Sequence, residues 1–258
     1  SYSKKKFCVS IDIFEEIINS DKAKRNWANI FFNTIKEAMG KSEMLIYDKT
    51  PEEIDKIIQD YLPVKKIEKK NHGEVFTPPD LVREMIGTLP DSVWRNKDLK
   101  WLDPANGTGN FPMVVYELLM KGLETVIPDK RTRSTHIIKN MLYMVELNEK
   151  NIAISRKIFG SDANIACANF LTEEDKWKRA FGGIDKFDII MGNPPYNEGG
   201  IRAKTTKKVK RDQSKSKSIW PDFVKKSLTL LKNTNSYLLF IHPASWISLK
   251  SKNGDLIT

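Results

Sequence analysis

The segment Asn193-Pro194-Pro195-Tyr196 holds the residues whose types and order are best suited to chemistry. Its two consecutive prolines stiffen the backbone and have no N–H group, so the carbonyls of this turn are available as acceptors. The carboxamide oxygen of Asn193 is a second acceptor, and Tyr196 offers a flat aromatic face. Two acceptors that hold both hydrogens of a planar amino group draw its nitrogen toward a tetrahedral geometry, which frees the lone pair to attack an electrophilic methyl group. The segment therefore predicts a catalytic pocket for a planar NH₂ group, with an ordinary Asn-Pro turn as the alternative.

A second segment, Asp103 to Phe111, is followed by a predicted helical run, Pro112 to Leu119. Gly107 and Gly109 allow a tight turn and a close approach of the backbone to a ligand. Pro112 stands where a dinucleotide-binding fingerprint needs its third glycine, and no Lys-Ser/Thr pair follows as in a P-loop, so a phosphate ligand is disfavoured. An aspartate at the end of a strand instead suits a cationic or amine-bearing ligand.

Glu146 ends the next apolar stretch, residues 140–146. Doubly wound folds place the acceptor for ribose hydroxyls at this position, about 20 residues after the glycine turn. The separation here is larger, so Lys121 to Lys139 must contain an insertion. Taken alone, Glu146 is equally well explained as a helix-capping or solvated acid.

Five short apolar stretches alternate with amphipathic helical stretches from about Asn71 onward, and we expect them to be strands. They are Leu99–Leu102, Met141–Glu146, Ile165–Ala168, Phe187–Met191 and Tyr237–Ile241. This alternation predicts an α/β fold, a Rossmann-like, mostly parallel sheet flanked by helices. Ligands then bind at the carboxyl ends of the strands, where the candidate residues lie. Residues 1–70 have helical spacing of apolar residues, so we expect an N-terminal helical region there and a catalytic domain over 71–258.

The composition limits the classes of protein to which this chain can belong. The 258 residues are 40% hydrophobic, carry a net charge of +10, and contain no apolar stretch long enough to cross a membrane, so we expect an intracellular globular protein. Cys8 and Cys167 stand far apart, and the three histidines are scattered, so no metal site is expected. Residues 202–217 hold eight basic residues against one acidic residue, which suits a polyanion or, alternatively, a solvated loop.

With these segments in this order, the sequence resembles the N6-adenine DNA methyltransferases of restriction-modification type. Members of this family have an Asn-Pro-Pro-Tyr motif. In the group that this sequence resembles, a second motif, which binds the cofactor's carboxylate, lies before the glycine turn. The resemblance extends from about Glu74 to Leu249. The matching segments are Glu74–Pro79, Asp103–Phe111, Val145–Glu146, Asn193–Tyr196, Trp220–Phe223 and Phe240–Trp246.

The resemblance implies an S-adenosylmethionine-dependent, adenine-specific DNA methyltransferase that acts on a flipped-out base. Asn193, Pro194, Pro195 and Tyr196 would be the catalytic residues. Residues that would bind the cofactor are Phe76 and Thr77 at its methionine end, Asp103, Ala105, Gly107 and Gly109 along its path, Glu146 at its ribose, and Asn169, Phe170 and Phe223 at its adenine. Asn169 departs from the family, which ordinarily has an aspartate there, and its carbonyl accepts the same hydrogen bond without charge.

DNA is the expected partner because the basic segment follows Tyr196 directly. We expect Lys204, Lys207, Lys208, Lys210 and Arg211 to contact the DNA backbone. Members of the resembled family normally have a further DNA-reading domain, whereas a dozen residues follow Trp246 here. The target-recognition domain is therefore expected to be missing from this sequence. Three explanations stay open: the sequence is a fragment, a separate domain or subunit reads the DNA, or the N-terminal helices do so.

Two other functions stay open at this point. A protein (release-factor) glutamine N5-methyltransferase uses the same pocket, because an amide NH₂ is also planar; the segment before the glycine turn and the basic segment argue against it. A noncatalytic DNA- or cofactor-binding subunit would keep the fold without turnover. The intact Asn193 to Tyr196 segment argues against that second alternative, and Asn169 keeps it open.

Overall fold

A computed structural model of the chain describes residues 49, 53, 77–197 and 218–243. By its internal contacts the chain divides after Met44, and all described residues belong to the second unit, Leu45–Thr258. The predicted helical region 1–70 lies outside the described residues, apart from residues 49 and 53. The boundary between residues 70 and 71 therefore stays a prediction.

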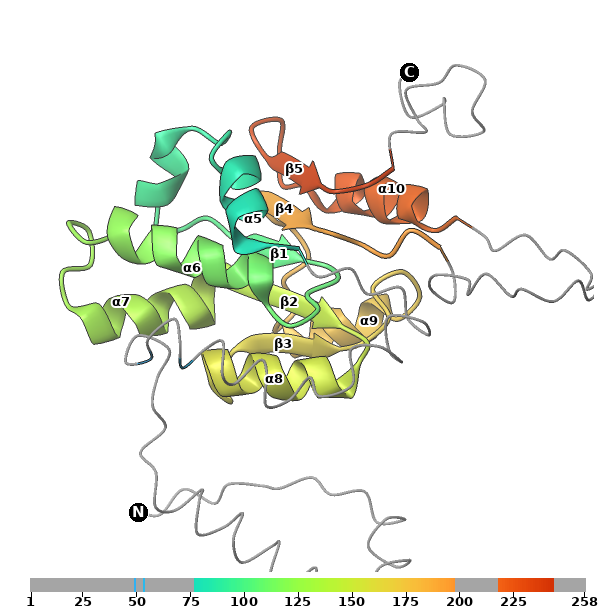
Figure 1. Cartoon of the computed structure of the whole chain (residues 1–258), viewed down its shortest axis with the longest axis horizontal. Coiled ribbons are helices and arrows are strands. Elements are labelled where there is room, and N and C mark those ends of the chain that lie inside the picture. The colour runs from blue at the N-terminus through green and yellow to red at the C-terminus, as the bar shows by residue number, and fades with distance from the viewer. Residues whose placement is uncertain (1–48, 50–52, 54–76, 198–217, 244–258) are drawn as a thin grey trace, which may run out of the picture. The chain divides into compact units, whose positions relative to one another are not determined.

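The described part of the chain contains five strands, which form one parallel sheet in the order β3-β2-β1-β4-β5 (Figure 1). Their bounds are Trp101–Asp103 for β1, Leu142–Glu146 for β2, Asn164–Cys167 for β3, Ile189–Gly192 for β4 and Tyr237–Phe240 for β5. The predicted α/β class is confirmed, and each predicted strand is present with ends shifted by at most two residues.

Helices cover both faces of the sheet because successive strand residues point to opposite sides. Trp101 of β1 packs with helices α5, α6 and α8 on one face, whereas Leu102 packs with α9 and α10 on the other. The helix bounds are Pro79–Ile86 for α5, Asn110–Gly122 for α6, Glu149–Phe159 for α8, Glu174–Ala180 for α9 and Trp220–Leu230 for α10. A short 3₁₀ helix, η2, spans Asp91–Arg95. Burial on both faces explains why the central strands are apolar throughout.

The insertion predicted between Lys121 and Lys139 is present. It contains α7, Lys130–His136, which continues into a π-helical turn, η3, Ile137–Met141. The Asp129 carboxylate caps α7 by accepting from the Thr132 backbone N–H at 2.7 Å. This extra helical stretch explains why Glu146 lies further from the glycine turn than usual.

Parallel strands end at a common edge, so the sheet gathers the residues that follow each strand. Asp103 ends β1, Glu146 ends β2 and Asn193 follows β4. These are the positions at which a doubly wound sheet binds its ligand. Among the described residues, no helix is long and apolar enough to cross a membrane.

Candidate functional site

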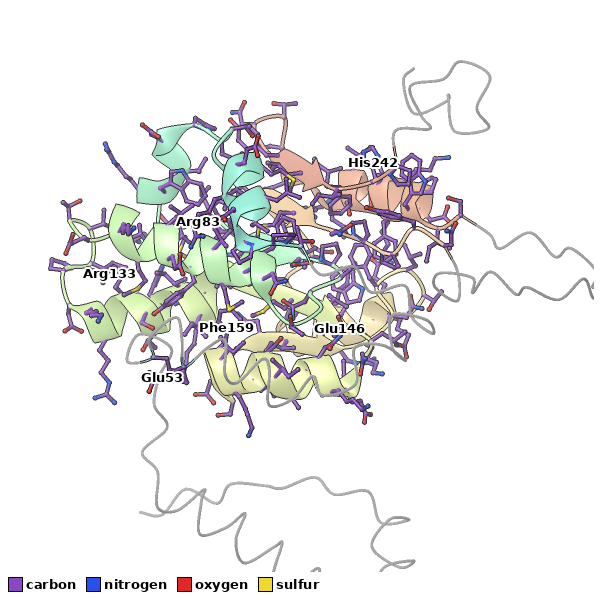
Figure 2. All side chains as sticks on the ribbon, in the orientation of Figure 1. Glu53, Arg83, Arg133, Glu146, Phe159 and His242 are labelled. Atoms are coloured by element: carbon purple, nitrogen blue, oxygen red, sulfur yellow. The ribbon has the colours of Figure 1, made fainter. Side chains whose placement is uncertain are left out.

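The glycine turn connects β1 to α6 and lies against α8. Gly109 is the N-cap residue of α6 with φ 94°, a left-handed conformation that favours glycine. A Cβ atom at Gly109 would lie 3.0 Å from the Phe159 ring of α8, which Figure 2 labels. The Asn106 backbone N–H donates to the Val145 carbonyl at 3.0 Å, which attaches the turn to β2. The backbone of the turn is thus held close to the carboxyl ends of two strands.

Glu146 orders this turn with its side chain. One carboxylate oxygen accepts from the Gly107 N–H at 2.7 Å, and the other accepts from the Leu147 and Asn148 N–H groups at 2.8 and 2.7 Å. The carboxylate is therefore oriented before any ligand binds. The sequence predicted Glu146 as a ligand-binding acid, and the structure adds that it connects the two loops that would hold the ligand.

Asp103 is a buried carboxyl group at the end of β1, with 1% of its surface exposed. Burial raises the pKa of the Asp103 carboxyl to about 8, the Ala105 N–H that donates to it at 3.0 Å lowers that pKa, and the negative charge of Glu146 raises it. A buried carboxylate is costly unless it is paired. The nearby charge is also negative, so this position favours a cationic ligand group.

Gly192 brings the end of β4 against Asp103. A Cβ atom on Gly192 would lie 2.8 Å from the Asp103 Oδ1 atom, closer than such atoms normally approach. The two strands are neighbours in the sheet, with Trp101 beside Ile189. The candidate catalytic segment, which starts at Asn193, therefore begins next to the buried carboxyl group.

Replacing Gly192 by alanine should lower the free energy of unfolding by about 1–3 kcal/mol, because the added methyl group forces Asp103 to move. Urea unfolding of the two proteins measures the difference. Gly160→Ala is the matched control, since Gly160 also has positive φ but an added Cβ would meet nothing within 4 Å. If Gly160→Ala destabilises the protein as much, backbone conformation rather than the close approach is the cause.

Asn193 donates from its Nδ2 atom to the Thr77 hydroxyl at 3.1 Å. Thr77 is 5% exposed, and its backbone carbonyl accepts from Asn110 Nδ2, also at 3.1 Å. The structure thus brings together residues of three predicted segments that lie far apart in the sequence. Phe76, the predicted neighbour of Thr77 in the cofactor site, lies outside the described residues.

Tyr196 ends the candidate catalytic segment and is held from its backbone. Its carbonyl accepts from the Ile219 N–H at 3.0 Å and from the Ser218 hydroxyl at 3.4 Å, and Asn197 forms an antiparallel bridge with Ser218. Burial raises the pKa of the Tyr196 phenol above its ordinary value, which is already far above neutral pH. The predicted DNA-binding residues at 204–211 lie outside the described residues. In the sequence they stand between Asn197 and Ser218.

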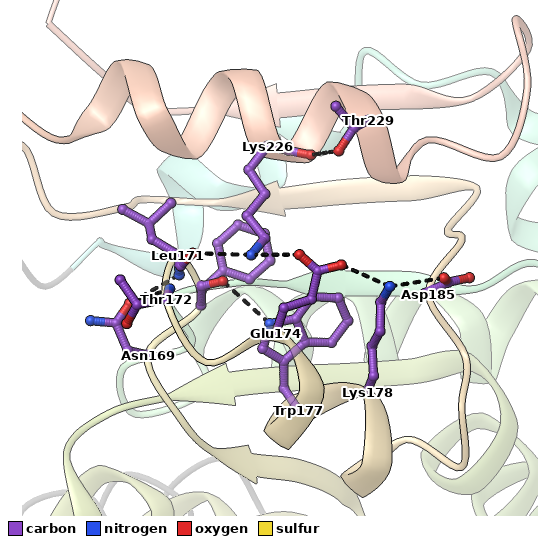
Figure 3. Close-up of polar contacts among 10 residues, drawn as sticks. Asn169, Leu171, Thr172, Glu174, Trp177, Lys178, Asp185, Lys226 and Thr229 are labelled. Carbon is purple, nitrogen blue, oxygen red and sulfur yellow. Dashed lines mark hydrogen bonds and ion pairs between the residues drawn. The ribbon is translucent and has the colours of Figure 1, made fainter.

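Asn169 follows β3 and shapes its own loop. Its Oδ1 atom accepts from the Leu171 and Thr172 N–H groups at 2.9 and 3.3 Å, as Figure 3 shows. The oxygen that we expect to meet the cofactor's adenine thus already accepts two hydrogen bonds, with which a ligand would compete. Asn169 also lines an open cavity of about 570 Å³ between this loop and α10, together with residues such as Asp222 and Lys225. Its predicted role stays a prediction.

Phe170 and Phe223, the other residues predicted at the cofactor's adenine, stack on each other. Their ring centroids lie 5.4 Å apart and their planes differ by 23°. Phe170 is 2% exposed and Phe223 is 6% exposed, so both belong mainly to the core beneath α9 and α10. Only a small part of either ring is available to a ligand.

Lys226 fastens α10 to the loop after β3 (Figure 3). Its ammonium group lies 2.9 Å from the Glu174 carboxylate and donates to the Leu171 carbonyl at 3.2 Å, with the Phe170 and Trp177 rings 5.3 and 5.7 Å away. Hydrogen bonds from Lys178 and then from Lys226 lower the pKa of the Glu174 carboxyl. These contacts of Lys226 keep α10 next to the loop after β3, and the cavity that Asn169 lines lies between the two.

We expect Lys226→Met to lower the free energy of unfolding by about 1–2 kcal/mol, because the variant keeps the apolar stem but loses the ion pair and the cation–π contacts. Thermal or urea unfolding measures this loss. Lys225→Met serves as the control, since Lys225 is exposed on the same helix and its replacement should change stability by less than about 0.5 kcal/mol. Equal effects at the two positions would contradict the contribution assigned to the contacts of Lys226.

Leu147 lies beside the site, where its backbone N–H donates to Glu146, and the sequence pattern did not single it out. Its side chain is 63% exposed although it is large and apolar, and it follows Glu146 directly. An apolar side chain just after a strand-end acid, where a polar residue is expected, was the available signal.

Among the described residues, no group of three His, Cys, Asp or Glu side chains is arranged to hold a metal ion.

The sequence matches the model of a known protein family. The family model of the Eco57I restriction-modification methylases matches residues 126–255, half of the chain, which include Glu146, Asn169 and Asn193 to Tyr196.

Two relatives match at the sequence level. An uncharacterized adenine-specific methylase of Mycoplasma pneumoniae is 26% identical over 254 residues, covering 71% of this chain and 58% of that protein. The type II methyltransferase M.HincII of Haemophilus influenzae is 25% identical over 193 residues, covering 70% of this chain and 30% of that protein. This chain thus spans little more than half the length of the first relative and less of the second.

A solved structure supports the fold. The nuclease-deletion mutant of the Type ISP restriction-modification enzyme LlaGI, in complex with a DNA substrate mimic, superposes with a TM-score of 0.59 at 19% identity. The match covers 95% of this chain and 26% of that chain. At this identity the likeness shows a shared fold.

Proposed function

The chain belongs to the Eco57I restriction-modification methylase family, and from this premise we propose that it transfers a methyl group from S-adenosylmethionine to the N6 amine of adenine in DNA. The observation that carries the proposal is the position of Asn193. Its side chain is held by Thr77, and its segment begins next to the buried Asp103 at the close approach made by Gly192. An acceptor for an amino group and a site for a cation thus lie side by side.

The residues present fit S-adenosylmethionine. Its methionine end carries a cationic ammonium group, and the buried Asp103 carboxyl group lacks a compensating positive charge in the contacts that set its pKa. When bound, S-adenosylmethionine supplies a methyl group that its sulfonium already activates. Thr77, Asp103, Ala105, Gly107 and Gly109 would hold its methionine end, Glu146 its ribose, and Asn169, Phe170, Phe223 and the exposed Leu147 its adenine.

The chain's own residues then prepare the target amine. The Asn193 Oδ1 atom and the Pro194 carbonyl accept its two hydrogens, which directs the nitrogen lone pair out of the ring plane. Pro195 keeps this turn stiff. The Tyr196 ring stacks on the extruded base.

DNA is proposed as the substrate on the strength of the relatives. One is named an adenine-specific methylase, and the LlaGI structure is a complex with a DNA substrate mimic. Asn197 and Ser218, which flank the segment that holds Lys204, Lys207, Lys208, Lys210 and Arg211 in the sequence, are bridged beside Tyr196, and this supports contact of those charges with the backbone around a flipped base. The greater length of the relatives supports a further domain or subunit that reads the DNA sequence.

Transfer of a labelled methyl group from S-adenosylmethionine to unmethylated DNA, followed by digestion to nucleosides, tests the proposal. We expect the label on N6-methyladenine, with transfer by Asn193→Ala slower by about 10²- to 10³-fold. A parallel reaction offers a release factor as the substrate. Label on a protein glutamine would favour the glutamine methyltransferase instead, and binding of cofactor and DNA without any transfer would favour a noncatalytic subunit.

A further inference from the structure

A chain of three hydrogen bonds, two of them buried and the third partly buried, joins the glycine turn to Asn193. The Thr108 hydroxyl donates to Asn110 Oδ1 at 3.3 Å, Asn110 Nδ2 donates to the Thr77 carbonyl at 3.1 Å, and Asn193 Nδ2 donates to the Thr77 hydroxyl at 3.1 Å. Thr77, Thr108 and Asn110 are each at most 9% exposed. In such surroundings side-chain hydrogen bonds are strong and hold a defined geometry.

The Thr77 hydroxyl determines how the Asn193 carboxamide lies. The last torsion of an asparagine side chain is broad, so a carboxamide with no partner has no single orientation. Here the Nδ2 atom takes the Thr77 hydroxyl as its acceptor, so the Oδ1 atom lies on the other edge of the planar amide group, directed away from Thr77. An inverted carboxamide would present a donor to the target amine and would not accept its hydrogens.

Asn110 in turn determines where Thr77 lies. Asn110 is the first residue of α6 and follows the glycine turn directly. Its bond to the Thr77 backbone carbonyl leaves the Thr77 hydroxyl to the bond with Asn193. A ligand that orders the glycine turn would therefore also order the partner of the catalytic amide.

We propose that Thr77, held by Asn110, is a positioning residue that orients the Asn193 carboxamide toward the target amine and couples it to the glycine turn. This inference rests on the proposed function. It also changes the expectation for Thr77, whose hydroxyl serves the catalytic asparagine in addition to any contact with the cofactor.

The test compares Thr77→Val, which keeps the shape of the side chain and removes the hydroxyl, with Thr77→Ser, which keeps the hydroxyl. The single-turnover rate constant for methyl transfer should fall about 10- to 100-fold in Thr77→Val, while the KM for DNA in a separate steady-state measurement stays nearly unchanged. Thr77→Ser should stay within about threefold of the wild-type protein. Asn110→Ala should lower the rate in the same direction.

A second measurement does not depend on turnover. The side-chain amide signal of Asn193 in a ¹⁵N NMR spectrum, assigned by its loss in Asn193→Ala, should shift and exchange faster in Thr77→Val and should be retained in Thr77→Ser. Thr88→Val is the matched control, because the Thr88 hydroxyl bonds only locally to the Met85 carbonyl at 2.7 Å and its loss should change neither measurement.

The two measurements separate the failure of this inference from the failure of the proposed function. An Asn193 amide signal unchanged in Thr77→Val would overturn the inference whether or not the protein methylates DNA. A shifted signal with an unchanged transfer rate would overturn it as well. A protein that methylates no DNA but shows the expected NMR changes would refute the proposed substrate and leave the positioning contact standing.

Discussion

Asn193→Ala should lower the rate of methyl transfer by about 10²- to 10³-fold, the usual cost of removing one group that stabilises a transition state. The variant removes the Oδ1 acceptor for the target amine, while the Pro194 carbonyl remains. Rapid-quench measurements with labelled S-adenosylmethionine give the rate of the chemical step. Cofactor binding should be nearly unchanged, because the contacts proposed for the cofactor come from other segments.

Asn197→Ala is the matched control for this prediction. Asn197 is an exposed asparagine four positions further along the same loop, and it meets Ser218 through its backbone bridge. We expect this variant to retain the wild-type rate. A similar loss in both variants would show that the loop conformation, rather than the Asn193 carboxamide, was disturbed.

Asp103→Asn should weaken cofactor binding strongly and change its pH dependence. In the wild-type protein the pKa of Asp103 is about 8, so at pH 7 the carboxyl group is mostly protonated before the ligand binds. Pairing with a cationic ammonium group requires the ionised form. Binding at pH 7 should therefore release about one proton, and the apparent Kd should fall nearly tenfold from pH 6 to pH 7.

Calorimetric titration in buffers of different ionisation enthalpy measures the released proton. In Asp103→Asn the proton release and the pH dependence should both disappear, because asparagine does not titrate. Asp98→Asn provides the control, since Asp98 is exposed and precedes the same strand. Persistence of the proton release in Asp103→Asn would mean that another group carries the linkage.

The same carboxyl group makes stability depend on pH. Its pKa in the folded protein lies above the ordinary value of 3.8, so the folded state holds more protons than the unfolded state between these two values. The contribution of Asp103 to the free energy of unfolding is therefore fully present below about pH 4 and is lost as the pH rises toward 8. Asp103→Asn should flatten this decline, which urea titrations at several pH values would show.

Much of the fold could be predicted because its signals are local. The five apolar stretches and the helices between them report which residues face a core, and that pattern requires only neighbouring positions. For the same reason the strand-end positions of Asp103, Glu146 and Asn193 followed from the sequence, as did the insertion before β2. Strand ends shifted by one or two residues, since hydrogen bonding with the neighbouring strand decides where pairing stops.

The contacts within the site could not be predicted in this way. Asn193 meets Thr77 across 116 positions of the sequence, and Gly107 meets Glu146 across 39. Both contacts depend on the strand order, in which β1 lies between β2 and β4. The sequence by itself determined the fold class, the strand-end residues and the resemblance to the N6-adenine methyltransferases. Only the tertiary structure decided that Asp103 is buried against Gly192 and that Thr77 holds Asn193, because burial and hydrogen bonding depend on neighbours that are distant along the chain.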